Sequence, residues 1–169
     1  MLAAALLFGT AVLQAGGAAD PTLDYVGAVG DAWVICPKAL VLSTIDEARL
    51  RESGFAKSEG KDAAAWTRDG EHPVVYARVR GADTVRLVVF PGKLCSIGLF
   101  GPTATVASEA YATNLAGRQG YEREPEAESG ATFHAYGRQF GARRVHVRFE
   151  RGAAAEAGVV WIRVTQGAQ

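Results

Sequence analysis

The sequence predicts an α+β fold in which two tandem helix-plus-antiparallel-sheet repeats form one domain, with the helices packed on one sheet face. Two observations lead to this prediction. The spacing of apolar residues changes from helical to alternating after residue 54, and again after residue 120. The second half also resembles the first, because residues 76–85 and 136–145 are identical at five of ten positions without a gap. We therefore expect internal repeats at about 38–100 and 101–169.

The N-terminus has much of the composition of a signal peptide. Residues 2–13 are almost wholly apolar, small residues follow, and the first charged side chain is Asp20. A signal peptide has such an apolar core before small residues at its cleavage site, although its usual basic start is missing here. The alternatives are an apolar first helix and an uncleaved anchor, but the run is short for a span of about 20 apolar residues. We expect a signal peptide over 1–19 and a single exported α+β domain over 20–169.

Export has consequences for location and for the cysteines. We expect a periplasmic or secreted protein of a bacterium, with no stable membrane insertion after signal cleavage. Cys36 and Cys95 are the two cysteines of the chain, and paired thiols form a bridge in an oxidising compartment. The sequence therefore predicts a Cys36–Cys95 disulfide. The cysteines and the three histidines lack the spacing of metal ligands, so we expect no metal and no cofactor.

The first half begins with helical signals. Asp20 and Pro21 suit the cap and the first residue of a helix, which we expect to stop at Pro37. Residues 44–47 have the pattern of a capping box with Thr44 as the N-cap, and they predict a short helix that ends at Gly54. Alternating apolar residues then predict strands at 64–68, 73–80, 84–90 and 93–100.

The second half follows the same order. A helix is expected from about residue 101 to between 117 and 120, where glycines interrupt the pattern. Strands are expected at about 131–138, 143–150 and 158–165.

Charge and motifs exclude several functions. The 18 basic and 18 acidic side chains balance, so no net field attracts nucleic acid or a membrane surface. The sequence contains no Gly-x-Ser-x-Gly elbow, phosphate loop, dinucleotide fingerprint or His-Glu-x-x-His motif. Locally the charge is uneven, because residues 121–130 carry four Glu and one Arg, whereas residues 131–169 carry six Arg and two Glu.

The predicted strands separate an aliphatic face from a face of aromatic, histidine and arginine residues. Successive side chains of a strand point to opposite sides, which places Val75, Ala77 and Val79 on the aliphatic face. The second face is either an ordinary solvated surface or a binding surface, since aromatics and arginine are enriched at interaction hot spots. The candidate binding residues are Tyr76, Arg78, Arg86, His134, Tyr136, Arg138, His146, Arg148, Trp161 and Arg163.

From these observations we expect a non-catalytic exported binding module, inhibitor-like, rather than an enzyme. Its partner would be an unknown protein or an anionic ligand, and not nucleic acid. The layout is similar, in architecture alone, to small exported bacterial proteins of tandem helix-plus-sheet units, among them secreted enzyme inhibitors. The alternative is a small envelope hydrolase with its site between the two repeats. A deep pocket with His134 or His146 beside a carboxylate would favour the enzyme, and a broad, shallow sheet face would favour binding.

Overall fold

The computed structural model describes residues 21–124, 132–152 and 158–167, so the predicted signal peptide at 1–19 lies outside the described residues. The first half contains α1 (Pro21–Val41), α2 (Glu47–Glu52), β1 (Ala56–Lys57), α3 (Lys61–Ala64), β2 (Val74–Arg80), β3 (Asp83–Phe90) and β4 (Leu94–Phe100). The second half contains α4 (Ala104–Gln119), β5 (Glu122–Arg123), β6 (Thr132–Phe140), β7 (Arg143–Arg151) and β8 (Val159–Gln166).

All of these strands join one antiparallel sheet, and the predicted α+β class is confirmed. The strand order is β1-β2-β3-β4-β8-β7-β6-β5, so β4 and β8 form the seam between the two halves of the chain. Along this seam Ile97 lies opposite Ile162, and Cys95 lies opposite Val164. The sheet is therefore continuous, and both halves contribute to one core.

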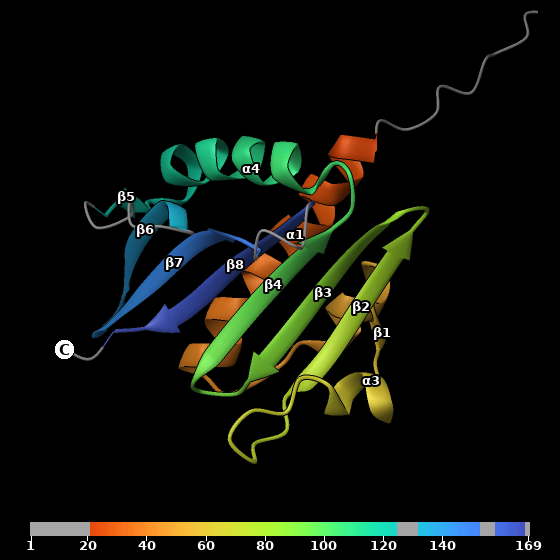
Figure 1. Cartoon of the computed structure of the whole chain (residues 1–169). Coiled ribbons are helices and arrows are strands. Elements are labelled where there is room, and N and C mark those ends of the chain that lie inside the picture. Colours follow the sequence, from red (N-terminus) through yellow and green to blue (C-terminus); the bar gives the residue numbers. More distant parts are fainter. Residues whose placement is uncertain (1–20, 125–131, 153–157, 168–169) are drawn as a thin grey trace, which may run out of the picture.

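Helices α1 and α4 lie together against one face of the sheet, which we call the helix face (Figure 1). Helix α1 contacts β3, β4 and β8, and α4 contacts β4 and β8. We call the opposite side the open face. Within the described part of the chain, no helix is long and apolar enough to cross a membrane.

The core lies between these helices and the sheet. Helix α1 buries one side because Val29, Trp33, Cys36 and Leu40 recur at helical spacing, each at most 1% exposed. The Trp33 indole makes edge contacts with the rings of Tyr111 in α4 and Tyr121, at centroid distances of 6.0 and 5.1 Å. The sheet supplies the aliphatic residues of alternating positions, namely Val85, Leu87, Val89, Ile97, Leu99, Val145, Val147, Val160, Ile162 and Val164.

The predicted disulfide is confirmed. Cys36 in α1 and Cys95 in β4 are bonded, with Cα atoms 5.5 Å apart and a sequence separation of 59. Both residues are fully buried, so the bond crosses the middle of the core.

Two predicted helix boundaries are wrong. Helix α1 continues through Pro37 to Val41, because Ala39 and Leu40 beyond the proline are fully buried and offset the hydrogen bond that proline removes. Helix α2 is capped by Asp46 and not by Thr44. The Asp46 carboxylate accepts a hydrogen bond from the amide of Arg49 at 3.1 Å.

The strand predicted at 64–68 is also absent from the sheet. Residues Lys61–Ala64 form the single turn of α3, and Arg68 makes an isolated bridge with Glu71 around a tight turn. Asp69 and Gly70 both have positive φ in that turn. The segment therefore leaves the sheet edge and brings Trp66 over the open face. The remaining predicted strands and the helix after residue 101 are present, with ends shifted by a few residues.

Candidate functional site

The ten candidate binding residues do not share one face. Tyr76 is paired with Leu87 and Tyr136 with Val147, and directly paired residues of a sheet point to the same side. The prediction was therefore right for β3, β7 and β8 and wrong for β2 and β6. The helix face holds Tyr76, Arg78, His134, Tyr136 and Arg138, and the open face holds Arg86, His146, Arg148, Trp161 and Arg163.

Tyrosine explains the inversion in β2. The Tyr76 side chain is 2% exposed and belongs to the core, whereas Val79, predicted to be buried, is 69% exposed. A tyrosine can bury its ring and still reach water with its hydroxyl. Here the hydroxyl donates to the Glu47 carboxylate of α2 at 2.8 Å, and burial raises the pKa of Tyr76. Tyr76 therefore fastens α2 to the sheet.

The other helix-face candidates also pack at the edge of the core. His134 stands edge-on to Phe149 at a centroid distance of 6.1 Å, and burial, followed by the charge of Arg123, lowers the pKa of His134. The Arg138 guanidinium lies 4.7 Å from the centre of the Phe140 ring. These contacts hold His134 and Arg138 against aromatic rings at the edge of the core.

Aromatic side chains form a cluster on the open face. Trp161 covers Gly98 of the neighbouring strand, where an added Cβ would come within 2.8 Å of the indole and 2.6 Å of Phe100. Its ring centre lies 5.3 Å from that of Trp66 and 5.4 Å from that of Phe100, edge-on in both cases. The Arg86 guanidinium lies 5.8 Å from the Trp66 ring. We call Trp66, Phe100 and Trp161 the aromatic cluster.

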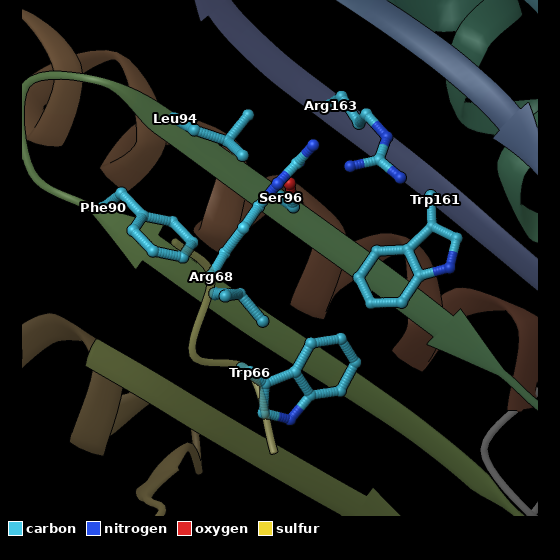
Figure 2. A pocket seen from close by; sticks show the side chains of 8 residues that line it. Trp66, Arg68, Phe90, Leu94, Ser96, Trp161 and Arg163 are labelled. Carbon is cyan, nitrogen blue, oxygen red and sulfur yellow. The ribbon is translucent and has the colours of Figure 1, made fainter. Parts of the chain in front are cut away.

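A hollow of about 140 Å³ opens beside this cluster, over β3, β4 and β8 (Figure 2). We call it the open-face hollow. Sites for drug-sized ligands usually have about 300–1,000 Å³, so this hollow is closer to the size of one side chain. Its lining consists of Trp66, Arg68, Val88, Phe90, Leu94, Ser96, Trp161 and Arg163.

Polar groups at the open-face hollow are mostly cationic. Arg163 is ion-paired through its Nε with Glu150 of β7. The Nε of Arg68 lies 3.8 Å from the carboxylate of Asp69, and the Arg68 side chain is 71% exposed. Ser96 is 4% exposed, and no group in the described part of the chain makes a hydrogen bond with its hydroxyl.

Sequence reasoning found Trp161 and Arg163 but missed Trp66, Arg68 and Ser96. Trp66 and Arg68 were assigned to a strand that does not form, and their position depends on the turn at 69–70. Ser96 stands in an apolar strand, and that polar residue in an apolar run was the one local signal of a special position.

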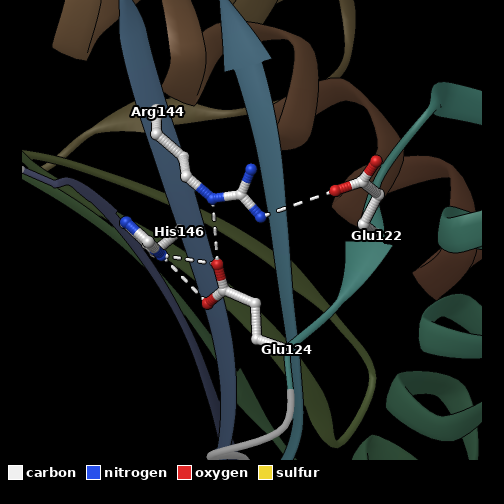
Figure 3. Close-up of polar contacts among 4 residues, drawn as sticks. All are labelled: Glu122, Glu124, Arg144 and His146. Atoms are coloured by element: carbon white, nitrogen blue, oxygen red, sulfur yellow. Dashed lines mark hydrogen bonds and ion pairs between the residues drawn. The ribbon is translucent and has the colours of Figure 1, made fainter.

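A second polar group on the open face joins β5 to β7 (Figure 3). The Glu124 carboxylate lies 2.8 Å from Nδ1 of His146 and 3.2 Å from Nε of Arg144. A side chain on Gly137 would collide with Glu124 and Arg144, so this glycine makes room for the cluster. We call Glu124, Arg144 and His146 the Glu124 cluster.

The Glu124 cluster has the histidine and carboxylate pair that the hydrolase alternative requires, but neither residue lines the open-face hollow. A side chain on Gly167 would collide with Nε2 of His146, so the second ring nitrogen is packed against the chain. Burial alone would raise the pKa of Glu124, but His146 and then Arg144 outweigh it and hold that pKa below its ordinary value of 4.5. The cluster ties β5 to the sheet through charge-assisted hydrogen bonds.

This arrangement predicts a pH-dependent contribution to stability. Because the folded state lowers the pKa of Glu124, its stabilisation is complete above the unfolded pKa and is lost as pH falls through the depressed one. Glu124→Gln should reduce the free energy of unfolding at pH 7 by about 1 kcal/mol. In urea titrations the variant and the wild type should converge well below pH 4.5.

The control for this prediction is Glu122→Gln. The Glu122 side chain is 80% exposed and lies 3.7 Å from Arg144, so its removal should change stability little at either pH. A constant difference between Glu124→Gln and wild type at all pH values would contradict the assigned role of the carboxylate charge.

Comparison of the chain with protein-family models, with curated proteins and with solved structures found no match.

Proposed function

We propose that the protein is a non-catalytic exported binding module that holds a protein partner on its open face. The observation that carries this proposal is the aromatic cluster, which stands beside the open-face hollow together with Arg68, Arg86 and Arg163. Tryptophan and arginine are the residue types most enriched at the centres of protein interfaces.

The geometry of the open face suits binding better than turnover. The hollow is small, at about 140 Å³, and lies on a sheet. Two of its walls are the rings of Trp66 and Trp161, which contact each other edge-on, and Phe100 also supports Trp161. Side chains fixed before binding lose little conformational freedom when a partner arrives. Where the partner is an enzyme, covering it with this face would make the module inhibitor-like.

We also propose a periplasmic or secreted location. The Cys36–Cys95 disulfide supports it, because disulfides persist in oxidising compartments and are rare in the cytosol of most organisms.

The two halves of the chain are further proposed to be related repeats. The strand order supports this, since the four strands of the first half lie on one side of the β4–β8 seam and the four strands of the second half lie on the other. The matched turns at Gly81 and Gly141 have φ of 59° and 58°. If α1 is the counterpart of α4, the first repeat begins at Pro21 and not at residue 38.

The alternative remains a small envelope hydrolase with its site between the two repeats, and one observation favours it. His146 lies beside the Glu124 carboxylate, as a histidine base with an orienting carboxylate would, although both residues belong to the second half of the chain and lie away from the β4–β8 seam. If a chromogenic ester or glycoside were hydrolysed by the wild type and not by His146→Ala, the hydrolase would replace the binding module.

The binding proposal predicts that Trp161→Ala weakens the partner complex by about 30-fold, since hot-spot truncation costs about 2 kcal/mol or more. The partner would be captured from the envelope fraction of the source cells, identified, and titrated against purified variants. Arg143→Gln is the control, because Arg143 is exposed at the start of β7, belongs to the helix face and is outside the hollow. Equal affinity of Trp161→Ala and Arg143→Gln for every captured protein would overturn the proposal.

A further inference from the structure

We infer that the open-face hollow binds the carboxylate of an acidic side chain, Asp or Glu, presented by a protein partner. This inference rests on the proposed function, because it names the chemistry by which the open face recognises its partner. Three features of the hollow lead to it.

The first feature is the convergence of two positive charges. In Figure 2 the guanidinium group of Arg68 lies over Ser96 and that of Arg163 lies beside it, although the two arginines come from different segments. The pair with Glu150 uses Nε of Arg163, and the terminal nitrogens of this arginine point toward the hollow. A guanidinium group has five N–H donors, so each arginine keeps donors for an anion in the hollow beyond its contact with Glu150 or Asp69.

The second feature is the Ser96 hydroxyl at the base of the hollow. This residue is 4% exposed and lacks a hydrogen-bond partner in the part of the chain that the structure describes. Buried hydroxyl groups normally have a partner, because leaving one without any is unfavourable. A carboxylate oxygen that enters between the two arginines would accept a hydrogen bond from Ser96.

The third feature is the apolar wall. Phe90, Leu94 and Trp161 surround the polar centre, and a hollow of about 140 Å³ has room for one side chain. These walls would contact the methylene groups of a glutamate or an aspartate, and the planar guanidinium groups match a carboxylate with two parallel hydrogen bonds. Inorganic phosphate offers no methylene group to these walls and phosphoserine offers one, whereas glutamate offers two, so the observations favour a carboxylate.

The test uses short peptides and the indole N–H signals of the full protein in NMR spectra. The probe is an acetylated and amidated peptide Gly-Phe-Glu-Leu-Gly, compared with the same peptide carrying glutamine or phosphoserine at the centre, and with inorganic phosphate. The glutamate peptide should shift the indole signals of Trp66 and Trp161. Trp33 of α1, which is buried in the core and 1% exposed, is the internal control, and its indole signal should not shift.

We expect the glutamine peptide to bind at least about tenfold more weakly than the glutamate peptide. Arg163→Gln, Arg68→Gln and Ser96→Ala should each weaken binding of the glutamate peptide by about fivefold or more, and Arg143→Gln should leave it unchanged. Arg68→Gln keeps the test valid if Arg163→Gln unfolds, because the exposed Arg68 side chain contributes little to packing.

Three results would overturn the inference. They are equal binding of the glutamine and glutamate peptides, the absence of any indole shift with the glutamate peptide, and tighter binding of phosphoserine or phosphate at the same tryptophans. The proposed function fails separately. If a captured partner depends on Trp161 but not on Arg68 or Ser96, the binding face stands and the carboxylate site falls. If the glutamate peptide binds but no captured partner depends on Trp161, the carboxylate site stands and the proposed binding function falls.

Discussion

Reduction of the Cys36–Cys95 disulfide should lower the free energy of unfolding by about 2–5 kcal/mol. The bond joins positions 59 residues apart, so its loss restores much freedom to the unfolded chain. It also joins α1 to β4 in the middle of the core, where both cysteines are fully buried. Urea titrations followed by circular dichroism, with and without a reductant, would measure the difference.

A variant in which both cysteines are alanine provides the control. Its stability should lie near that of the reduced protein, and the reductant should not change it. Protein isolated from an oxidising compartment should show no reactive thiol after denaturation without reductant. Two reactive thiols in that sample would contradict the disulfide and would remove the main support for export.

Replacement of Tyr76 by alanine should cost about 3–5 kcal/mol of folding free energy, the range measured for buried aromatic side chains. The ring is 2% exposed, and its loss would leave a cavity between α2 and the sheet. Tyr76→Phe keeps the ring and should cost about 1 kcal/mol for the hydrogen bond. That bond to Tyr76, followed by Lys57, holds the pKa of Glu47 below its ordinary value.

The matched control for Tyr76 is Val79→Ala in the same strand. Val79 is 69% exposed on the opposite face, so this change should stay within about 0.5 kcal/mol of the wild type in urea titrations. The strand pattern read from sequence predicts the reverse order of effects. A larger loss for Val79→Ala than for Tyr76→Ala would therefore restore the sequence-based assignment of the two faces.

Sequence patterns located most strands of the fold but could not always tell which side of a strand faces the helices. In β7 and β8, aliphatic residues alternate with histidine, arginine and tryptophan, and in β3 Arg86 marks the opposite side, so the pattern identifies the buried side. In β2, valine alternates with tyrosine and arginine, and both sides can be buried in part. The decision there depends on how far the helices extend over the sheet, which is a property of tertiary packing.

The candidate site was predictable only in part, for a related reason. Trp161 and Arg163 lie on a strand whose alternation is clear, and their face was predicted correctly. Trp66 and Arg68 reach the same hollow from a segment that pairs with no neighbouring strand of the sheet. Their contacts join residues almost a hundred positions apart, and local propensity carries no information about such pairs.

The two outermost strands affect how the protein behaves at high concentration. Strands β1 and β5 are two residues long, and they carry Lys57, Glu122 and Arg123. Long, flat and apolar outer strands invite pairing between molecules and fibril growth, whereas short and charged ones oppose it. The two ends of the sheet therefore oppose strand pairing between molecules.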